Sequence, residues 1–94
     1  MALSERFEND KIEVVGPYKA VQVRKATIIE KDGVEISRSF HRHALQCGKL
    51  DDSDNLVDTD ISGEDADVQA ICIAAWSAPV KAAYKAFLIA NKPA

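Results

Sequence analysis

The chain has 94 residues, of which 47% are hydrophobic and 29% charged, and its formal net charge is −3. This length suits one small domain with a thin core, and the composition is that of a globular protein rather than a disordered or fibrous one. The sequence holds no apolar run of about 18 residues and no signal-peptide pattern at its start, so we expect neither a membrane partner nor secretion.

The charges are unevenly distributed along the chain. Residues 19–49 carry seven basic and three acidic side chains, whereas residues 50–68 carry eight acidic side chains and no Lys or Arg. A basic segment and an acidic segment can pair within one chain or between subunits. The net negative charge disfavours nucleic acid as a partner.

The N-terminal residues are the least regular part of the sequence. Residues 1–10 are polar and are predicted to form a flexible arm, or a strand that orders only on a partner. Residues 11–15 have the pattern of a short strand, which Gly16-Pro17 ends.

The strongest local signal is a β-hairpin centred on Asp32-Gly33. This dipeptide suits a type I′ turn, in which both central residues have positive φ, and it lies between two runs rich in β-branched residues. We therefore predict a strand over residues 18–30 and another from residue 34 to about residue 44.

A two-residue turn would set Lys31 opposite Val34, Ile29 opposite Ile36 and Lys25 opposite Phe40. In this register one face of the hairpin is apolar and is predicted to face the core: Val21, Val23, Ile29, Val34, Ile36 and Phe40. The other face is mostly polar: Gln22, Arg24, Glu30, Glu35, Ser37, Ser39, His41 and His43. Because a slip of one residue would mix the two sets, their separation supports the register.

Residues 45–62 are predicted to form a long acidic loop, and loops of this length are usually functional, disordered or part of an interface. Ser62 and Asp65 resemble a capping box at the start of a helix from Glu64 to Trp76. This helix is apolar nearly all round, and the domain is too small to surround it. We therefore predict an oligomer interface on the helix, formed by Val68, Ile71, Ile73 and Trp76.

A second helix is predicted after Ser77, which serves as its N-cap, with Pro79 in the first turn. Its apolar stripe has helical spacing and consists of Val80, Ala83, Tyr84, Phe87 and Leu88. The predicted fold is α+β: an antiparallel three-stranded sheet with a central β-hairpin, followed by two C-terminal helices packed on one face, in a single domain over residues 1–94.

Two histidines form the most suggestive chemical cluster. His41 and His43 lie two residues apart on a strand, so both point to one face, and metal sites use this spacing. A third ligand would have to come from Cys47 or from the acidic loop. The alternative is that both histidines decorate a solvated or subunit-facing strand. We predict no metal and no cofactor, and we assign Arg24, His41 and His43 to the binding of an anionic ligand.

Residues 58–63 begin like a calcium loop, with acidic residues first and third and Gly sixth, but the twelfth position is Gln69 rather than Glu. A loop that leads into a helix cap is the favoured interpretation. The carboxylates of the acidic loop have no fixed partner, and no serine has a nucleophile-elbow setting. We therefore predict no catalytic residue. Cys47 and Cys72 are predicted to be free thiols.

Several stretches of the chain share a common resemblance. The runs Asp10–Arg24 and Asp32–His43, with the helical stretches Asp67–Cys72 and Val80–Tyr84, resemble small uncharacterised proteins of marine tailed bacteriophages. This resemblance covers most of the chain. It implies a phage-like origin and a place in the cytoplasm of the host cell or in the virion. Because that family has no assigned activity, it implies no catalytic or binding residue.

Three functions remain open at this point. The first is a non-catalytic structural or assembly protein that acts as a homo-oligomer, with other virion or assembly proteins as further partners. The second is a small module that binds an anionic ligand through the polar sheet face. The third, which the sequence supports least, is a metal-dependent enzyme.

Overall fold

The computed structural model describes residues 2–93. The fold is α+β, as predicted: a three-stranded antiparallel sheet in the order β1-β2-β3 precedes a small two-stranded sheet and two helices. The elements are β1 (Leu3–Val15), β2 (Ala20–Lys31), β3 (Val34–Leu45), β4 (Gly48–Leu50), β5 (Leu56–Asp58), α1 (Ala66–Ala75) and α2 (Ala78–Ala90).

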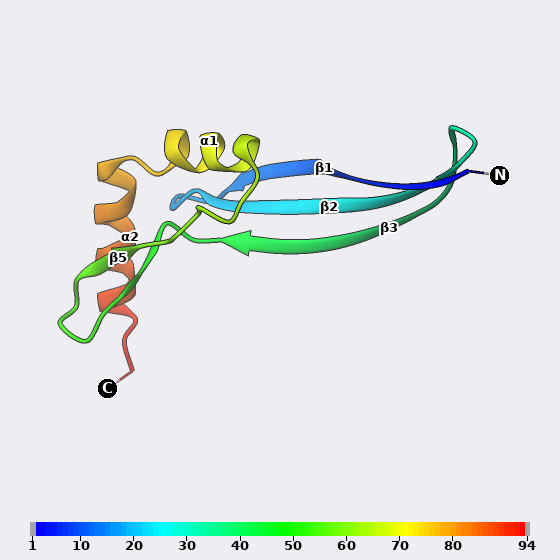
Figure 1. The fold of residues 1–94 in the computed structure, drawn as a ribbon. Coiled ribbons are helices and arrows are strands. Elements are labelled where there is room, and N and C mark those ends of the chain that lie inside the picture. The colour runs from blue at the N-terminus through cyan, green and yellow to red at the C-terminus, as the bar shows by residue number, and fades with distance from the viewer. Residues whose placement is uncertain (1, 94) are drawn as a thin grey trace.

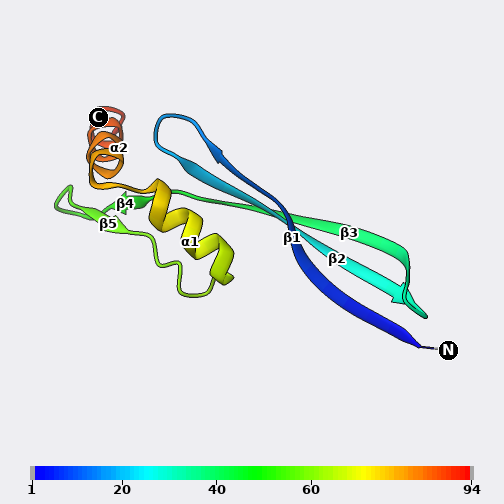
Figure 2. The ribbon, with the colours of Figure 1, turned by 90° about the horizontal axis from the view of Figure 1, so that it is seen from above.

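The molecule is strongly elongated. Its radius of gyration is 17.5 Å and its extents are 59 × 27 × 21 Å, whereas a compact chain of this length has a radius of gyration of about 12 Å. Both helices lie at one end of the sheet, and the β2–β3 turn and the N-terminus lie at the other (Figures 1 and 2). The far half of the sheet therefore has no covering layer.

The segment predicted as a flexible arm is part of the longest strand. β1 pairs with β2 from Leu3 opposite Lys31 to Val15 opposite Ala20. The amide nitrogen of Ala2 also donates a hydrogen bond of 3.1 Å to Asp32 Oδ1, and the carbonyl oxygen of Ala2 accepts one of 2.9 Å from the amide nitrogen of Asp32. The prediction of an arm was wrong because the sequence of these residues is polar, and it does not reveal that β2 offers them a free row of backbone partners.

The Asp32-Gly33 turn is confirmed. Asp32 has φ 51° and Gly33 has φ 82°, as a type I′ turn requires. Lys31 lies opposite Val34, as predicted, and Glu30 lies opposite Glu35. The next pair is Ile29 with Ser37, so Ile36 is the extra residue of a β-bulge.

This bulge overturns the rest of the predicted register. Lys25 lies opposite His41 rather than Phe40, and Val23 lies opposite His43. A shift of one residue exchanges the faces of β3. We call the two faces the helix face, which carries Val21, Val23, Lys25, Thr27 and Ile29 of β2, and the arginine face, which carries Gln22, Arg24, Ala26, Ile28 and Glu30.

The core lies on the helix face, at the end where α1 covers the sheet. It consists of Val21, Val23, Cys47, Val68, Cys72 and Trp76, all buried. Of the predicted core residues on the hairpin, Val34, Ile36 and Phe40 are instead exposed. Ala26 and Ile28 are fully buried on the arginine face, where their cross-strand neighbours include Arg6, Arg38 and Phe40. The long stems of such side chains can cover apolar neighbours.

Helix α1 is buried on one side only. Val68 and Cys72 face the core, whereas 71% of Ile73 is exposed. The N-cap is Asp65 rather than the predicted Ser62, and its side chain makes no capping hydrogen bond. Trp76, at the C-terminal end, donates a hydrogen bond of 2.8 Å from Nε1 to the carbonyl oxygen of Lys19. This contact fixes α1 to the β1–β2 turn.

Helix α2 has the predicted N-cap, because Ser77 Oγ accepts a hydrogen bond of 3.5 Å from the amide of Val80. It lies at the same end of the molecule as α1 (Figure 2) and packs against the β1–β2 turn, where Tyr18 lies 5.4 Å from Tyr84 and 4.9 Å from Phe87, measured between ring centroids. None of its residues is fully buried. Neither helix within residues 2–93 is long and apolar enough to cross a membrane.

The acidic loop is ordered around the β4–β5 hairpin. Asp51 Oδ1 accepts hydrogen bonds of 2.9 Å from the amides of Ser53 and Asn55, which close the turn between the strands. Lysines of the C-terminal region bind the same loop: Lys81 pairs with Asp58 at 3.1 Å and Lys92 with Asp54 at 2.6 Å. Part of the acidic charge is therefore neutralised within the chain.

Candidate functional site

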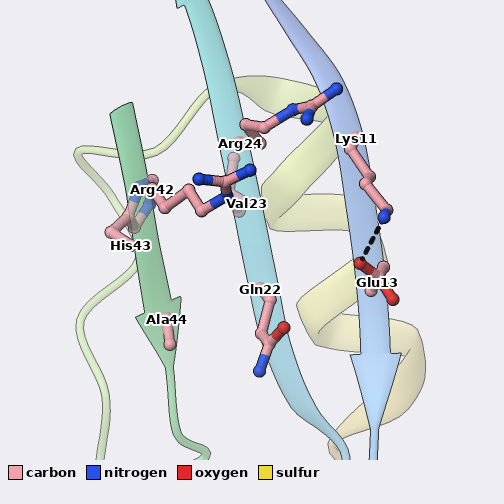
Figure 3. A pocket seen from close by; sticks show the side chains of 8 residues that line it. All are labelled: Lys11, Glu13, Gln22, Val23, Arg24, Arg42, His43 and Ala44. Atoms are coloured by element: carbon pink, nitrogen blue, oxygen red, sulfur yellow. Dashed lines mark ion pairs between the residues drawn. The ribbon is translucent and has the colours of Figure 1, made fainter. Parts of the chain in front are cut away.

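A shallow groove of about 380 Å³ crosses the arginine face, opposite α1. Its charged and polar side chains come from all three strands: Lys11 and Glu13 from β1, Gln22 and Arg24 from β2, and Arg42 and His43 from β3 (Figure 3). The strands bring these residues together because Arg24 lies directly opposite both Lys11 and Arg42. Paired residues share a face of a sheet, so the three basic side chains gather on one side.

Arg24 is the most firmly held side chain of this groove. It donates hydrogen bonds to Asp10, of 2.9 Å from Nε to Oδ1 and 2.7 Å from Nη2 to Oδ2. These hydrogen bonds lower the pKa of Asp10, and the same pairing raises the pKa of Arg24. Its guanidinium carbon lies 4.3 Å from the centroid of the Phe40 ring, a cation–π contact. Arg24 is thus already neutralised within the chain.

Arg42 differs from Arg24 in having no ion-pair or hydrogen-bond partner among residues 2–93. Its side chain extends over the sheet toward β2 (Figure 3). Lys11 pairs with Glu13 at 3.2 Å, with both side chains about half exposed. The groove therefore offers one unpaired guanidinium to an anion, together with a solvent-exposed ion pair of Lys11 with Glu13.

The strand register places His41 and His43 on the helix face, and His43 also lines this groove. They face one side, as the spacing predicted, and their ring centroids are 6.4 Å apart. His43 Nε2 lies 2.8 Å from Glu64 Oε1, in the loop before α1. The predicted binding set of Arg24, His41 and His43 is therefore divided between two faces, and its grouping on one face was wrong. The cause is the bulge at Ile36, which the alternation pattern does not reveal.

The histidine region links the sheet to the start of α1. It surrounds a cavity of about 310 Å³ lined by Asn9, Lys25, His41, His43, Glu64 and Asp65, among others. Lys25 pairs with Asp65 at 3.4 Å, and Asn9 Nδ2 donates to Asp65 Oδ2 at 2.9 Å. These contacts lower the pKa of Asp65. The polar groups here are used to dock the loop on the sheet.

Metal binding finds no geometric basis in the described part of the chain. No group of three His, Cys, Asp or Glu side chains in residues 2–93 is placed to hold a metal ion. In the loop that resembles a calcium site, Asp60 Oδ1 accepts a hydrogen bond of 2.9 Å from the amide of Ser62, and Asp58 pairs with Lys81. Cys47 and Cys72 are free and buried, and desolvation raises the pKa of both thiols.

The four residues of the predicted oligomer interface differ in their burial. Val68 and Trp76 are buried within the chain, so neither presents a side chain to a partner in this structure. Ile71 is partly buried against the core, and only Ile73 of the four lies largely exposed. The prediction treated α1 as surrounded by other chains, whereas β2, β3 and the loop before β4 cover one side of it.

A larger apolar surface lies at the far end of the sheet, and sequence analysis missed it. Leu3, Phe7 and Val34 are 65%, 59% and 64% exposed, and the β1–β2–β3 register places all three on the helix face. Leu3 and Phe7 fall in the segment predicted as an arm, and Val34 was assigned to the core. The even spacing of Leu3 and Phe7, with polar residues between them, was the available signal, since residues four apart on a strand lie on the same face.

Comparison with known proteins adds no relative: no protein-family model, curated protein or solved structure matches this chain.

Proposed function

We propose that this chain is a non-catalytic structural or assembly protein that acts as an oligomer, and that the uncovered half of the sheet mediates the assembly. The observation that carries the proposal is the exposed apolar surface of Leu3, Phe7 and Val34, far from the helices. Exposed large apolar side chains that gather on one face are typical of interaction sites on soluble proteins. The elongated shape supports the same function, because a sheet of this length buries little within one chain.

The open edges of the sheet favour assembly as well. β1 and β3 are edge strands of 13 and 12 residues, and within residues 2–93 each has one row of backbone groups that no other strand pairs. Proteins usually protect edges of this length or use them for association. The resemblance to phage proteins is consistent with a component of a virion or of its assembly pathway, and this context is part of the proposal.

The test is the mass of the protein in solution. Light scattering coupled to size exclusion, over a range of protein concentrations and at low and high salt, is expected to give a mass above the 10.3 kDa of one chain. The larger species is expected to persist in high salt because apolar burial is not screened. A monomer at every concentration would overturn the proposal.

A second candidate function is the binding of an anionic ligand in the groove of the arginine face. The unpaired guanidinium of Arg42 favours it, in a groove that Lys11 lines from the other side of β2. Titration with inorganic phosphate, followed by amide NMR spectra, is expected to shift the signals of residues around Arg42 in the wild type and not in Arg42→Gln. Lys49→Gln, an exposed lysine on β4, is the matched control. An unchanged wild-type spectrum would remove this candidate.

A further inference from the structure

The apolar surface at the far end of the sheet contains two charges that the chain leaves unpaired. We define the distal patch as Leu3, Glu5, Phe7, Ile29, Lys31 and Val34, all on the helix face beyond the reach of α1. Glu5 lies opposite Ile29, and Lys31 lies opposite Leu3 and Val34. Neither Glu5 nor Lys31 has an ion-pair or hydrogen-bond partner among residues 2–93.

The reverse side of the same strands is quite different. There Arg6 pairs with Glu30 at 2.8 Å, and Arg38 pairs with Glu35 at 2.8 Å and with Glu8 at 3.1 Å. These pairs lie over the fully buried Ile28, whose cross-strand neighbours are Arg6 and Arg38. The charged groups of the arginine face therefore pair with one another and cover its apolar residues. The distal patch, on the other face, keeps exposed apolar side chains and unpaired charges.

Resting on the proposed function, we infer that a second copy of this chain covers the distal patch, packed face to face about a twofold axis so that Glu5 of each copy lies beside Lys31 of the other. The composition of the patch favours this partner. It carries one acidic and one basic group among apolar residues, so its formal charge is zero and it is its own complement. A twofold interface uses the same patch on both subunits and requires this property.

Association through the open edges of β1 and β3 alone would not bury the distal patch. Edge-to-edge association of β1 or β3 would join backbone groups and leave Leu3, Phe7 and Val34 in solvent. Face-to-face packing instead removes these side chains from water in both copies, which is the favourable term in most protein association. A strongly acidic partner would place like charges against Glu5, and a strongly basic partner would place like charges against Lys31.

Charge reversal in two separate variants tests the inference. Glu5→Lys places two lysines on each patch and Lys31→Glu places two glutamates, so each variant alone is expected to dimerise at least about tenfold more weakly than the wild type. An equimolar mixture of the two is expected to recover the wild-type mass, because every Lys of one copy then meets a Glu of the other. A chain with both substitutions is expected to dimerise by itself.

Several outcomes separate this inference from the proposed function. A wild type that is monomeric would overturn both. A wild-type oligomer whose mass is unchanged in Glu5→Lys, in Lys31→Glu and in Phe7→Ser would overturn the inference and leave the proposed function standing. Circular dichroism and thermal unfolding of each variant show whether it is folded, and recovery on mixing cannot arise from a folding defect in either chain. Single variants that weaken association without any recovery on mixing would exclude the pairing of Glu5 with Lys31.

Discussion

Asp10 binds Arg24 through both carboxylate oxygens, and Asp10 is the extra residue that β1 inserts between the pairs Asn9–Lys25 and Lys11–Arg24. The bulge lets Asn9 point to α1, where it binds Asp65, while Asp10 points to the arginine face. Two adjacent residues of one strand thereby serve the two faces of the sheet. The ion pair fixes the position of the bulge, and with it the register of the distal half of β1.

The ion pair predicts a pH dependence of stability. Because Arg24 lowers the pKa of Asp10 in the folded state, the unfolded chain takes up a proton at a higher pH than the folded chain. The contribution of Asp10 to the free energy of unfolding is therefore complete above the ordinary pKa of Asp and is lost as the pH falls through the folded-state value. In Asp10→Asn, we expect lower stability at neutral pH and a smaller loss on acidification.

Urea denaturation between pH 7 and pH 3 measures this difference. Other carboxylates with lowered pKa values, among them Glu35 and Asp51, will give both proteins a residual acid dependence. Asp52→Asn, at an exposed loop position, is the matched control and is expected to unfold like the wild type. If the free energy of unfolding depended equally on pH in Asp10→Asn and in the wild type, the stabilising role of the Asp10–Arg24 pair would be contradicted.

The one-sided burial of α1 predicts unequal effects of two substitutions on the same helix. Val68→Ala removes two buried methyl groups from the core and is expected to lower the free energy of unfolding by about 2 kcal/mol. Ile73→Ala removes more carbon atoms from a side chain that is mostly in solvent, and we expect a change within about 0.5 kcal/mol. Denaturation at low protein concentration is the measurement. A large loss in Ile73→Ala would show that another chain covers this position.

The hairpin turn predicts a local backbone effect. Gly33 has φ 82°, and a side chain at this angle costs about 1 kcal/mol or more, even though no atom lies within 4 Å of the site of a new Cβ. Gly33→Ala is therefore expected to destabilise through strain alone. Gly63→Ala is the control, since Gly63 also has open space around it and lacks a positive φ. Similar thermal unfolding midpoints for the two variants would argue against a type I′ turn.

The sequence was sufficient for the elements whose signals are local. Asp32-Gly33 specifies its turn through the φ values that only a few residues adopt, and Ser77 specifies the start of α2 through its hydroxyl group. The fold class followed from these signals, because a hairpin and two helical segments leave few arrangements in so short a chain. Such features depend on residues that are neighbours in the chain.

The features that sequence analysis missed depend on pairing between distant residues. The bulge at Ile36 moves His41 and His43 to the helix face, whereas the alternation of apolar and polar residues in the sequence favours the register without a bulge. Residues 3–10 join the sheet because β2 pairs them, although their own sequence is polar. The candidate site changed for this reason: Arg24 and the histidines lie on opposite faces of the sheet, and the exposed surface of Leu3 and Phe7 takes the place of the helix as the contact region in our proposal.

The contact between Trp76 and the β1–β2 turn yields a final prediction. Trp76 Nε1 donates to the carbonyl oxygen of Lys19, a residue with φ 53°, so one hydrogen bond joins the end of α1 to a strained turn. Trp76→Phe keeps an aromatic ring in the core and removes this donor. We expect the free energy of unfolding to fall by about 1 kcal/mol, since the chain loses one part-buried hydrogen bond.

Circular dichroism during urea denaturation is the appropriate probe, because the variant lacks the single tryptophan of the chain. Amide hydrogen exchange should also become faster in the β1–β2 turn and at the end of α1, while exchange at the Asp32-Gly33 turn remains as in the wild type. This comparison separates a local link from a general loss of packing. Faster exchange at both ends of the sheet would mean that Trp76 stabilises the whole sheet rather than the turn it contacts.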